Sequence, residues 1–359
     1  MVRRQENILP SHEELTERRA RFAGLTRPEL AVVSAYTKID LSTRLAQSPL
    51  AQDDYAAARF LTPYFPPKIA ELFADEIPRH GLRRELIATR AINELVDMVG
   101  AVFIFNLTRD YGVTAEEALR GWLFASGVLK LRDRAEAVRN DPNLSAEAEI
   151  SAFLALEGAA RRGSAWAVMY ADPATAIGAA VDRYQSALAQ LTDNFEQFLA
   201  GGERERFERL YREFRTAVHR EDLAHQLARL AFADHLLNVL GLGFARNLEP
   251  VEVARPYFGL SQRFEFATLE DAIGAIATDD HWERRAANDL ADELIAARTR
   301  LCSLLLDSPD AANPAEVIAR GRERRAAETD RLMGDLRALP SLGLPALSVA
   351  VRSLARLTT

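Results

Sequence analysis

The sequence has few of the residues on which many enzyme active sites depend. Only one of its 359 residues is a cysteine, and only three of its 45 basic residues are lysines. A chain with one cysteine has no disulfide framework, which is typical of cytoplasmic proteins. An aldolase, an amino-acid dehydrogenase or a P-loop enzyme needs a placed lysine. We therefore expect a cytoplasmic chain with few candidates for lysine-based chemistry.

Long apolar segments are also missing. The apolar runs fall short of the roughly 20 residues that cross a bilayer. The first residues, Met1–Asn7, include arginines but lack the apolar core of a secretory signal. The formal net charge is −7, whereas binding to nucleic acid or to an anionic membrane depends on clustered cations. We predict that the chain binds neither nucleic acid nor membrane.

Alternating β-branched runs bounded by hairpin turns are absent, and apolar residues recur with helical spacing almost everywhere. Single cores stop growing at roughly 250 to 300 residues, so a chain of this length is expected to divide. We predict an all-α fold in two packed helical subdomains without significant β-sheet. The turn cluster Asn140–Asn143 is the best candidate boundary. It separates an entry segment (1–24) and an N-terminal subdomain (25–139) from a C-terminal bundle (144–359).

Capping signals place several helix starts. Thr26 and Glu29 form a capping-box pattern, and Pro28 lies in the first turn, where its missing N–H costs nothing. The stretch from Gly81 to Asp110 is predicted to form one central helix of about 43 Å at 1.5 Å per residue. The predicted helices span 11–24, 25–47, 53–61, 68–77, 81–110, 114–138, 145–171, 173–200, 203–217, 219–240, 249–258, 268–277, 281–307, 313–337 and 342–357.

One helix shows an apolar ridge at i, i+4 spacing that should face a neighbouring helix. The residues of this ridge are Trp282, Ala286, Leu290, Leu294, Leu301 and Leu305. Cys302 lies beside this ridge and is interpreted as a small core residue rather than a nucleophile. Asp279 or Asp280 is predicted to cap the same helix.

The nearest match to a dinucleotide motif is Gly241–Arg246, which lacks the third glycine and follows no strand. We interpret it as a helix end that uses glycine in left-handed geometry. The sequence contains no P-loop, nucleophile elbow or cysteine zinc cluster. His80 precedes a helix and is expected to cap or pack.

A polar group between residues 221 and 235 is a candidate for a metal site. It consists of Glu221, Asp222, His225, Asp234 and His235. A di-metal helical bundle requires two Glu-x-x-His pairs and two further carboxylates on separate helices, and only one loose pair is present. We therefore interpret these residues as surface or core-edge polar groups.

The most informative polar cluster is Arg83, Arg84 and Glu85, at the start of the long predicted helix. Two cations at a helix N-terminus oppose the helix dipole, so carboxylate partners elsewhere are expected. We predict that this cluster, together with Arg27 and Glu29, contacts another domain. A solvated face and a phosphate site are the alternatives.

The order of the motifs resembles the C-terminal helical region of the large bacterial NAD-specific glutamate dehydrogenases. In the first half, the likeness is carried by Leu25–Val32, Tyr36, Lys38, Ile39, Tyr64–Pro66, His80–Thr89, Asn93 and Gly100. In the second half it is carried by Asp280–Glu283, Ala287, Leu290–Leu301, Ser348–Arg352, Leu354 and Leu357. It covers nearly the whole chain, from about Leu9. The chain departs from the family pattern at Asp97, at Ala101–Val102 and at Ala165.

The resemblance implies a role within a larger enzyme. Members of this family are much longer homo-oligomeric polypeptides that oxidatively deaminate L-glutamate to 2-oxoglutarate and ammonium with NAD. Their nucleotide-binding fold and catalytic lysines belong to an upstream dehydrogenase domain. The resemblance thus implies a structural or regulatory segment without catalytic, cofactor-binding or metal-binding residues, inactive alone, whose partner is that upstream domain. A stand-alone helical scaffold for protein interaction and a metal-dependent helical-bundle enzyme are the competing hypotheses.

Overall fold

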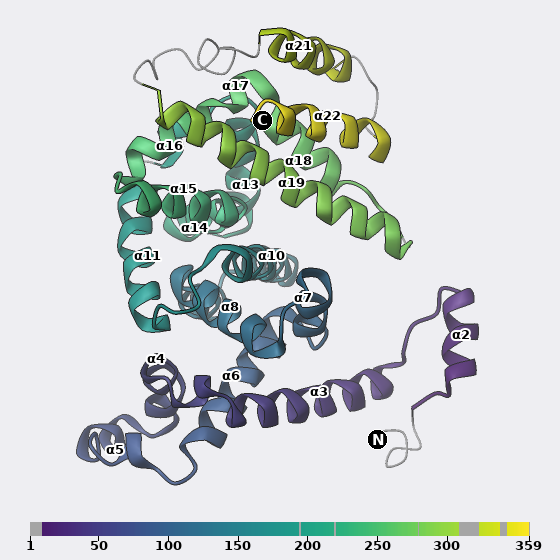
Figure 1. Ribbon diagram of the computed structural model, residues 1–359. Coiled ribbons are helices and arrows are strands. Elements are labelled where there is room, and N and C mark those ends of the chain that lie inside the picture. Colours follow the sequence, from purple (N-terminus) through teal and green to yellow (C-terminus); the bar gives the residue numbers. More distant parts are fainter. Residues whose placement is uncertain are drawn as a thin grey trace. The chain divides into compact units, whose positions relative to one another are not determined.

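In the computed structural model every described element is helical, and no strand occurs in residues 9–193, 195–218, 220–278, 280–308, 323–337 and 343–358, which the structure describes (Figure 1). The all-α prediction is therefore confirmed. The chain forms two compact units. The first unit comprises Met1–Gly127 and Ala160–Val181, and the second comprises Val128–Ala159 and Asp182–Thr359. The predicted subdomain division at residues 140–143 stays a prediction.

The first unit is built around two long helices, α3 and α6, that pack against each other. Its elements are α2 (His12–Ala20), α3 (Arg27–Gln47), η1 (Pro49–Gln52), α4 (Asp54–Ala56), η2 (Ala57–Leu61), η3 (Thr62–Tyr64), α5 (Pro67–Leu72), η4 (Ile77–Arg79), α6 (Arg83–Val99), α7 (Phe103–Tyr111) and α8 (Ala115–Val128). Two further helices, α10 (Ala146–Tyr170) and α11 (Ile177–Thr192), contribute residues to both units.

In the second unit α19 packs against α22, α18 and α16. The elements are α9 (Leu131–Arg139), α12 (Phe195–Phe198), α13 (Gly202–Ala217), α14 (Glu221–Leu230), α15 (Ala233–Arg246), α16 (Pro250–Gly259), α17 (Ser261–Phe264), α18 (Phe266–Gly274), α19 (His281–Leu306), α21 (Glu323–Arg337) and α22 (Leu344–Arg356). The predicted helix over 313–337 begins outside the described residues.

The local capping predictions are confirmed. The Thr26 N–H donates to Glu29 Oε2 at 2.6 Å. Asp280 caps α19 through the N–H groups of Trp282 and Glu283, while Asp279 lies outside the described residues. Ser11 with Glu14, Thr114 with Glu117, and Ser145 cap further helices in the same way.

The predicted 173–200 helix is wrong, because it divides into α11 and α12. Three further predicted continuous helices are also wrong, because each is broken. The predicted 81–110 helix ends at Gly100, whose φ of +80° is accessible mainly to glycine, and α7 continues at 83° to α6. The predicted 114–138 helix breaks at Lys130, which has φ +46°. The predicted 219–240 helix divides into α14 and α15, which meet at 73°. In all three cases apolar periodicity continues across the bend and conceals it.

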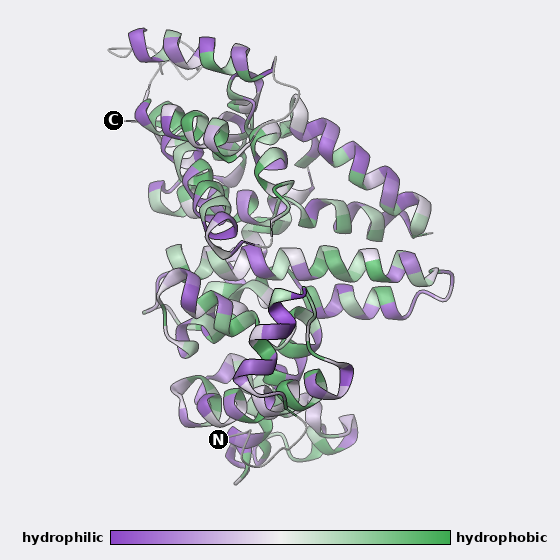
Figure 2. Ribbon diagram, turned by 90° about the vertical axis from the view of Figure 1, so that its right-hand side faces the viewer, coloured by the Kyte–Doolittle hydropathy of each residue, from purple (hydrophilic) through white to green (hydrophobic). Residues whose placement is uncertain are grey.

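Each unit buries an aromatic core. In the first unit Trp122 is fully buried and stacks on Phe60, with ring centroids 6.4 Å apart. In the second, Phe195 contacts Phe232 and Phe258, with centroids 5.3 and 5.7 Å apart. Figure 2 shows hydrophobic and hydrophilic residues alternating along the helices, as one buried and one exposed face require.

None of the helices in the described ranges is both long and apolar enough to cross a bilayer alone. The bent pairs α6–α7 and α14–α15 meet that criterion of length and composition only when the two helices of each pair are taken together.

Candidate interdomain surface

A polar groove lies along the contact between α3 and α6. Its volume is about 590 Å³. From α3 it is lined by Lys38, Ile39, Ser42, Thr43, Ala46 and Gln47, and from α6 by Arg84, Glu85, Thr89 and Asn93. Lysine, arginine, hydroxyl and amide groups thus share one concave surface. Six of these residues belong to the motifs that carry the family resemblance, namely Lys38, Ile39, Arg84, Glu85, Thr89 and Asn93.

Of the predicted interdomain residues, the structure brings Arg84 and Glu85 together in this groove. Arg84 Nη1 lies 3.5 Å from the carbonyl oxygen of Ala46, in the last turn of α3. A cation is favoured there because a helix C-terminus carries partial negative charge. For Arg84 the expected carboxylate partner is thus replaced by a helix end, whereas Arg83 Nη2 lies 3.5 Å from Asp54 Oδ1. The Glu85 side chain is exposed.

The other predicted residues lie outside this groove. Arg83 donates to the carbonyl oxygens of Pro78 at 3.0 Å and Gln52 at 2.8 Å, so it ties the preceding loops to α6. Glu29 accepts two bonds from Arg18, at 3.0 and 2.8 Å. The bonds from Arg18 hold the pKa of Glu29 at about 2. Arg27 is exposed at the start of α3.

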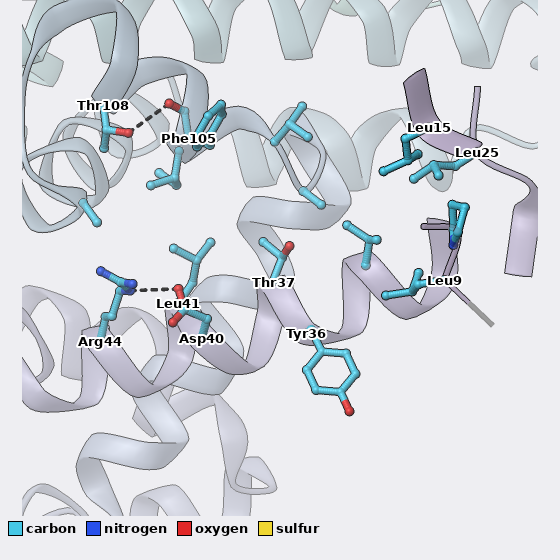
Figure 3. Close-up of a pocket in the computed structure, with 16 residues that line it drawn as sticks. Leu9, Leu15, Leu25, Tyr36, Thr37, Asp40, Leu41, Arg44, Phe105 and Thr108 are labelled. Atoms are coloured by element: carbon cyan, nitrogen blue, oxygen red, sulfur yellow. Dashed lines mark hydrogen bonds and ion pairs between the residues drawn. The ribbon is translucent and has the colours of Figure 1, made fainter. Parts of the chain in front are cut away.

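A second groove, which is apolar, lies between α3 and α7 (Figure 3). Its volume is about 660 Å³. Leu41 and Ile104 are buried at its base. Val102, just before α7, is 56% exposed, and Phe105, on α7, is 64% exposed. Leu9, Leu15 and Leu25 line one end. Sequence reasoning missed this groove because it exists only where the chain bends at Gly100.

The second unit contains a buried charge network, which we define as Glu203, Arg206, His235, Tyr257, Glu270 and Arg298. Arg298 and Glu203 are both fully buried and form an ion pair. Arg298 also donates to the carbonyl oxygen of Tyr257 at 3.1 and 3.0 Å. Glu270 accepts from Arg206 at 2.9 Å and lies 3.2 Å from His235 Nε2. The network thereby joins α13, α15, α16, α18 and α19.

The charges in this network set the protonation of its members. Burial alone lowers the pKa of His235, but the carboxylates of Glu270 and Asp234 outweigh it and raise that pKa above its ordinary value. Burial raises the pKa of Glu270, but His235, Arg206 and Arg298 outweigh it and hold that pKa well below its usual range. The geometry therefore favours an ionised Glu270 beside a protonated His235.

We expect the free energy of unfolding of the second unit to fall at alkaline pH, and a His235→Gln substitution to flatten that dependence. Because folding raises the pKa of His235, its contribution is complete below about pH 6.5 and is lost as the pH rises through the folded-state value. The slope for one proton is at most about 1.4 kcal/mol per pH unit. Urea unfolding between pH 6 and 10 measures it.

The matched control for this prediction is His225→Gln. His225 lies in the same unit but outside the network, with a partly exposed side chain packed on Tyr211 at a ring distance of 4.0 Å. It should keep the alkaline slope of the unsubstituted chain. Equal slopes for the His235→Gln variant and the unsubstituted chain would contradict the assignment of this proton.

The glycine-rich motif does not fit a dinucleotide. Gly241 and Gly243 both lie inside α15, and a Cβ at Gly243 would be 3.0 Å from the Leu248 carbonyl oxygen. The left-handed residue at the end of this helix is Asn247, not a glycine as predicted. A pyrophosphate cradle needs glycines at a strand-to-helix turn, so these residues offer no cradle for NAD.

The remaining singled-out residues have structural roles. His80 accepts a bond from the Leu82 N–H at 3.1 Å and packs on Phe65, as predicted. Cys302 is fully buried, and burial raises the pKa of its thiol to about 12, which fits a core residue. Among the residues that the structure describes, no group of three or more histidines, cysteines or acids could hold a metal ion.

Comparison with known proteins agrees with the motif order. Residues 23–356 match the family described as "Glutamate dehydrogenase, C-terminal". The chain is 30% identical to the NAD-specific glutamate dehydrogenase of Mycobacterium tuberculosis, over 99% of this chain and 22% of that protein. The proteins of the same name from Pseudomonas aeruginosa and Halomonas elongata are each 28% identical, over 87% and 85% of this chain.

The chain spans only 19–22% of the length of these curated relatives. The matched family nevertheless covers most of the chain itself. Together with the helical architecture of the described residues, this match shows that the chain belongs to the glutamate dehydrogenase C-terminal family.

Proposed function

We propose that this chain is the C-terminal helical region of an NAD-dependent glutamate dehydrogenase that oxidises L-glutamate to 2-oxoglutarate and ammonium. The family match over residues 23–356 carries this proposal. The helical region supports or regulates the catalytic domain and supplies no catalytic or NAD-binding residue. Its single dinucleotide-like motif is helical and offers no cradle for NAD. NAD therefore binds the dehydrogenase domain, and the complete enzyme is a cytoplasmic homo-oligomer.

Purification of the protein from its source tests this division of labour. The chain is tagged at the end of its own gene, and NAD reduction by L-glutamate is measured on the purified material and on residues 1–359 alone. We expect turnover by the purified enzyme and none by residues 1–359. Purified material without this activity would instead favour the stand-alone scaffold, and turnover by residues 1–359 would refute a non-catalytic role.

The groove between α3 and α6 is the proposed contact with the dehydrogenase domain. Arg84 and Glu85 present opposite charges within one concave surface, and Lys38 on the facing helix pairs with Asp97 at 2.9 Å. Arginine is enriched at the energetically dominant positions of interfaces because its planar guanidinium binds carboxylates with two bonds. Arg27, exposed at the start of α3, extends this proposed contact, whereas Glu29 is buried and bonded to Arg18.

An Arg84→Ala substitution should weaken association with the dehydrogenase domain by about 1.4 kcal/mol, which is a factor of about ten. Arg90→Ala is the matched control, because Arg90 is exposed on the same helix but does not line the groove. Association is measured by titrating separately purified parts against each other. Equal affinities of the two variants would remove Arg84 from the interface.

An Arg83→Ala substitution has a different expected result. Arg83 bonds two carbonyl oxygens of its own unit, so we expect a loss of about 2 kcal/mol in unfolding free energy. The affinity of the folded variant should be unchanged. The contrast between two adjacent arginines separates internal stabilisation from contact with another domain.

A further inference from the structure

The apolar groove between α3 and α7 takes no part in the proposed contact through Arg84. Its walls are aliphatic and aromatic, and its base is formed by the buried side chains of Leu41 and Ile104. Phe105 and Val102 stand at its rim with more than half of their surface exposed. An exposed apolar patch with a concave shape marks an interaction site more often than a chance feature of the surface.

The polar side chains of this groove are largely paired within the chain. Arg44 donates to Asp40 at 2.8 Å, and Thr108 donates to the Phe105 carbonyl oxygen at 2.9 Å, as Figure 3 shows. Sites for small metabolites instead direct a few polar groups at the ligand. Groups that already satisfy each other favour an occupant whose contact surface is apolar.

The surroundings define the shape of that occupant. The groove runs between two helices, and the part of the chain that the structure describes has no sheet edge to which a strand could add. Helical domains commonly bind the apolar face of an amphipathic helix in such a groove. A third helix can place its apolar ridge between α3 and α7 by ordinary ridge-into-groove packing.

Two observations indicate which segment supplies this helix: the share of each relative that the chain covers, and the residues that line the groove. The matched family is a C-terminal one, and the match covers only 19–22% of each relative, so most of the relatives' polypeptide precedes the matched region. Leu9 and Pro10 line the groove, so a segment that precedes them in a longer polypeptide is tethered beside it. Tethering raises the effective concentration to the millimolar range for short flexible linkers.

We propose that the apolar groove between α3 and α7 binds the apolar face of an amphipathic helix from the dehydrogenase part of the same enzyme. This inference rests on the function proposed above and adds a second contact to the polar groove. The apolar groove supplies buried area, while Arg84 and Glu85 supply orientation through charge. The two grooves use different faces of α3. This helix contributes Thr37, Asp40 and Leu41 to the apolar groove and Lys38, Ile39 and Ser42 to the polar groove.

Photocrosslinking in the intact enzyme tests this proposal. Phe105 is replaced by p-benzoylphenylalanine in the native gene, the protein is purified and irradiated, and the crosslinked peptides are identified by mass spectrometry. The control replaces Val349, which is 54% exposed on α22 of the second unit. We expect a crosslink from position 105, and none from position 349, to a helical segment of the dehydrogenase part.

Each other outcome overturns the proposal. A crosslink from position 105 to residues 23–356 of a second copy would show an interface between copies, and a crosslink to a small molecule would show a ligand site. Absence of any crosslink would show an open groove. NAD-dependent glutamate oxidation is measured on the same preparation. Activity without the expected crosslink overturns only the proposed binding of a helix in the groove, whereas lack of activity overturns the proposed function as well.

A second variant gives an independent readout. Phe105→Asp places a charge on the rim, and because the side chain is 64% exposed the unit should still fold. We expect the enzyme carrying it to lose activity at elevated temperature at least fivefold faster than the unsubstituted enzyme. The Val349→Asp enzyme should change less than twofold. Equal inactivation rates for the two variants would overturn the proposal.

Discussion

An Arg298→Ala substitution is expected to lower the free energy of unfolding of the second unit by about 3–5 kcal/mol. The guanidinium is fully buried and forms an ion pair with Glu203, which is also fully buried. Its Nη1 atom lies 3.8 Å from Glu270 Oε1. Removing it leaves the Glu203 carboxylate without its ion-pair partner in an environment of low polarity, while Glu270 keeps Arg206 and His235. It also removes both bonds to the Tyr257 carbonyl oxygen.

The double variant Glu203→Leu, Arg298→Met should recover much of this loss. Within the described structure, the oxygens of Glu203 and Nη1 of Arg298 have no contact with hydrogen-bond geometry, although the two groups form an ion pair. Replacement of a buried pair by apolar residues of similar volume is often neutral or stabilising. A double variant no more stable than Arg298→Ala would show that the pair itself stabilises the fold.

Hydrogen exchange of the α19 amides measures both variants, because a local measurement remains valid where two units unfold separately. The control is Arg300→Ala, which removes an exposed arginine two positions along the same helix. It should change stability by no more than about 0.5 kcal/mol. Similar losses for Arg298→Ala and Arg300→Ala would contradict the buried role of Arg298.

The position of Arg298 shows what helical periodicity can and cannot predict. The predicted ridge of α19 is confirmed at Leu290, Leu294, Leu301 and Leu305, which are all buried. Its first residue was wrongly included, since Trp282 is 74% exposed near the helix start. Arg298 stands four residues after Leu294 and three before Leu301, so helical spacing puts it on the buried face, although the predicted ridge did not include it. Its partners could not be predicted, because they come from three other helices, α13, α16 and α18.

The bends mark a second limit. Capping boxes depend on residues three apart, so the sequence contains all the information needed to predict them. The break at Gly100 depends instead on a backbone angle, and a glycine within an apolar helix is compatible with either a bend or a continuous helix. That bend turns α7 away from the line of α6 and creates the apolar groove, which is why the groove had no sequence signal.

The predicted interdomain cluster was identified as a group but not divided by role. Arg83 and Arg84 are adjacent and equally charged, yet one bonds the carbonyl oxygens of Pro78 and Gln52 while the other lines the groove. The difference depends on how the segments before α6 fold back on its first turn. Long-range packing of this kind is not encoded in the spacing of the cluster, so only its charge and its helix position could be predicted.

The second large effect is expected in the core of the first unit, where a Trp122→Ala substitution should cost about 3–5 kcal/mol. Trp122 on α8 is fully buried and stacks on Phe60. Its neighbour Gly121 lets α10 approach closely, since a Cβ there would lie 2.8 Å from Val168 Cγ2. A side chain held by close-packed helices leaves a cavity that the surroundings refill only in part, and the cost of that cavity adds to the lost apolar burial.

Two further tryptophan variants separate packing from polarity. The Trp122 indole N–H is buried and has no hydrogen-bond partner within the described residues. Trp122→Phe removes that donor and keeps most of the ring, so its cost should be clearly smaller than that of Trp122→Ala. Trp282→Ala, at a 74% exposed site, should cost no more than about 0.5 kcal/mol. Urea unfolding followed by far-ultraviolet circular dichroism measures all three, and an equal cost at positions 122 and 282 would contradict the assignment of Trp122 to the core.

The Trp122→Ala substitution should also affect binding to the dehydrogenase domain. Because α8 and α10 pack around Trp122 in the unit that also carries both grooves, a loss of stability here should weaken that binding by lowering the fraction of folded first unit.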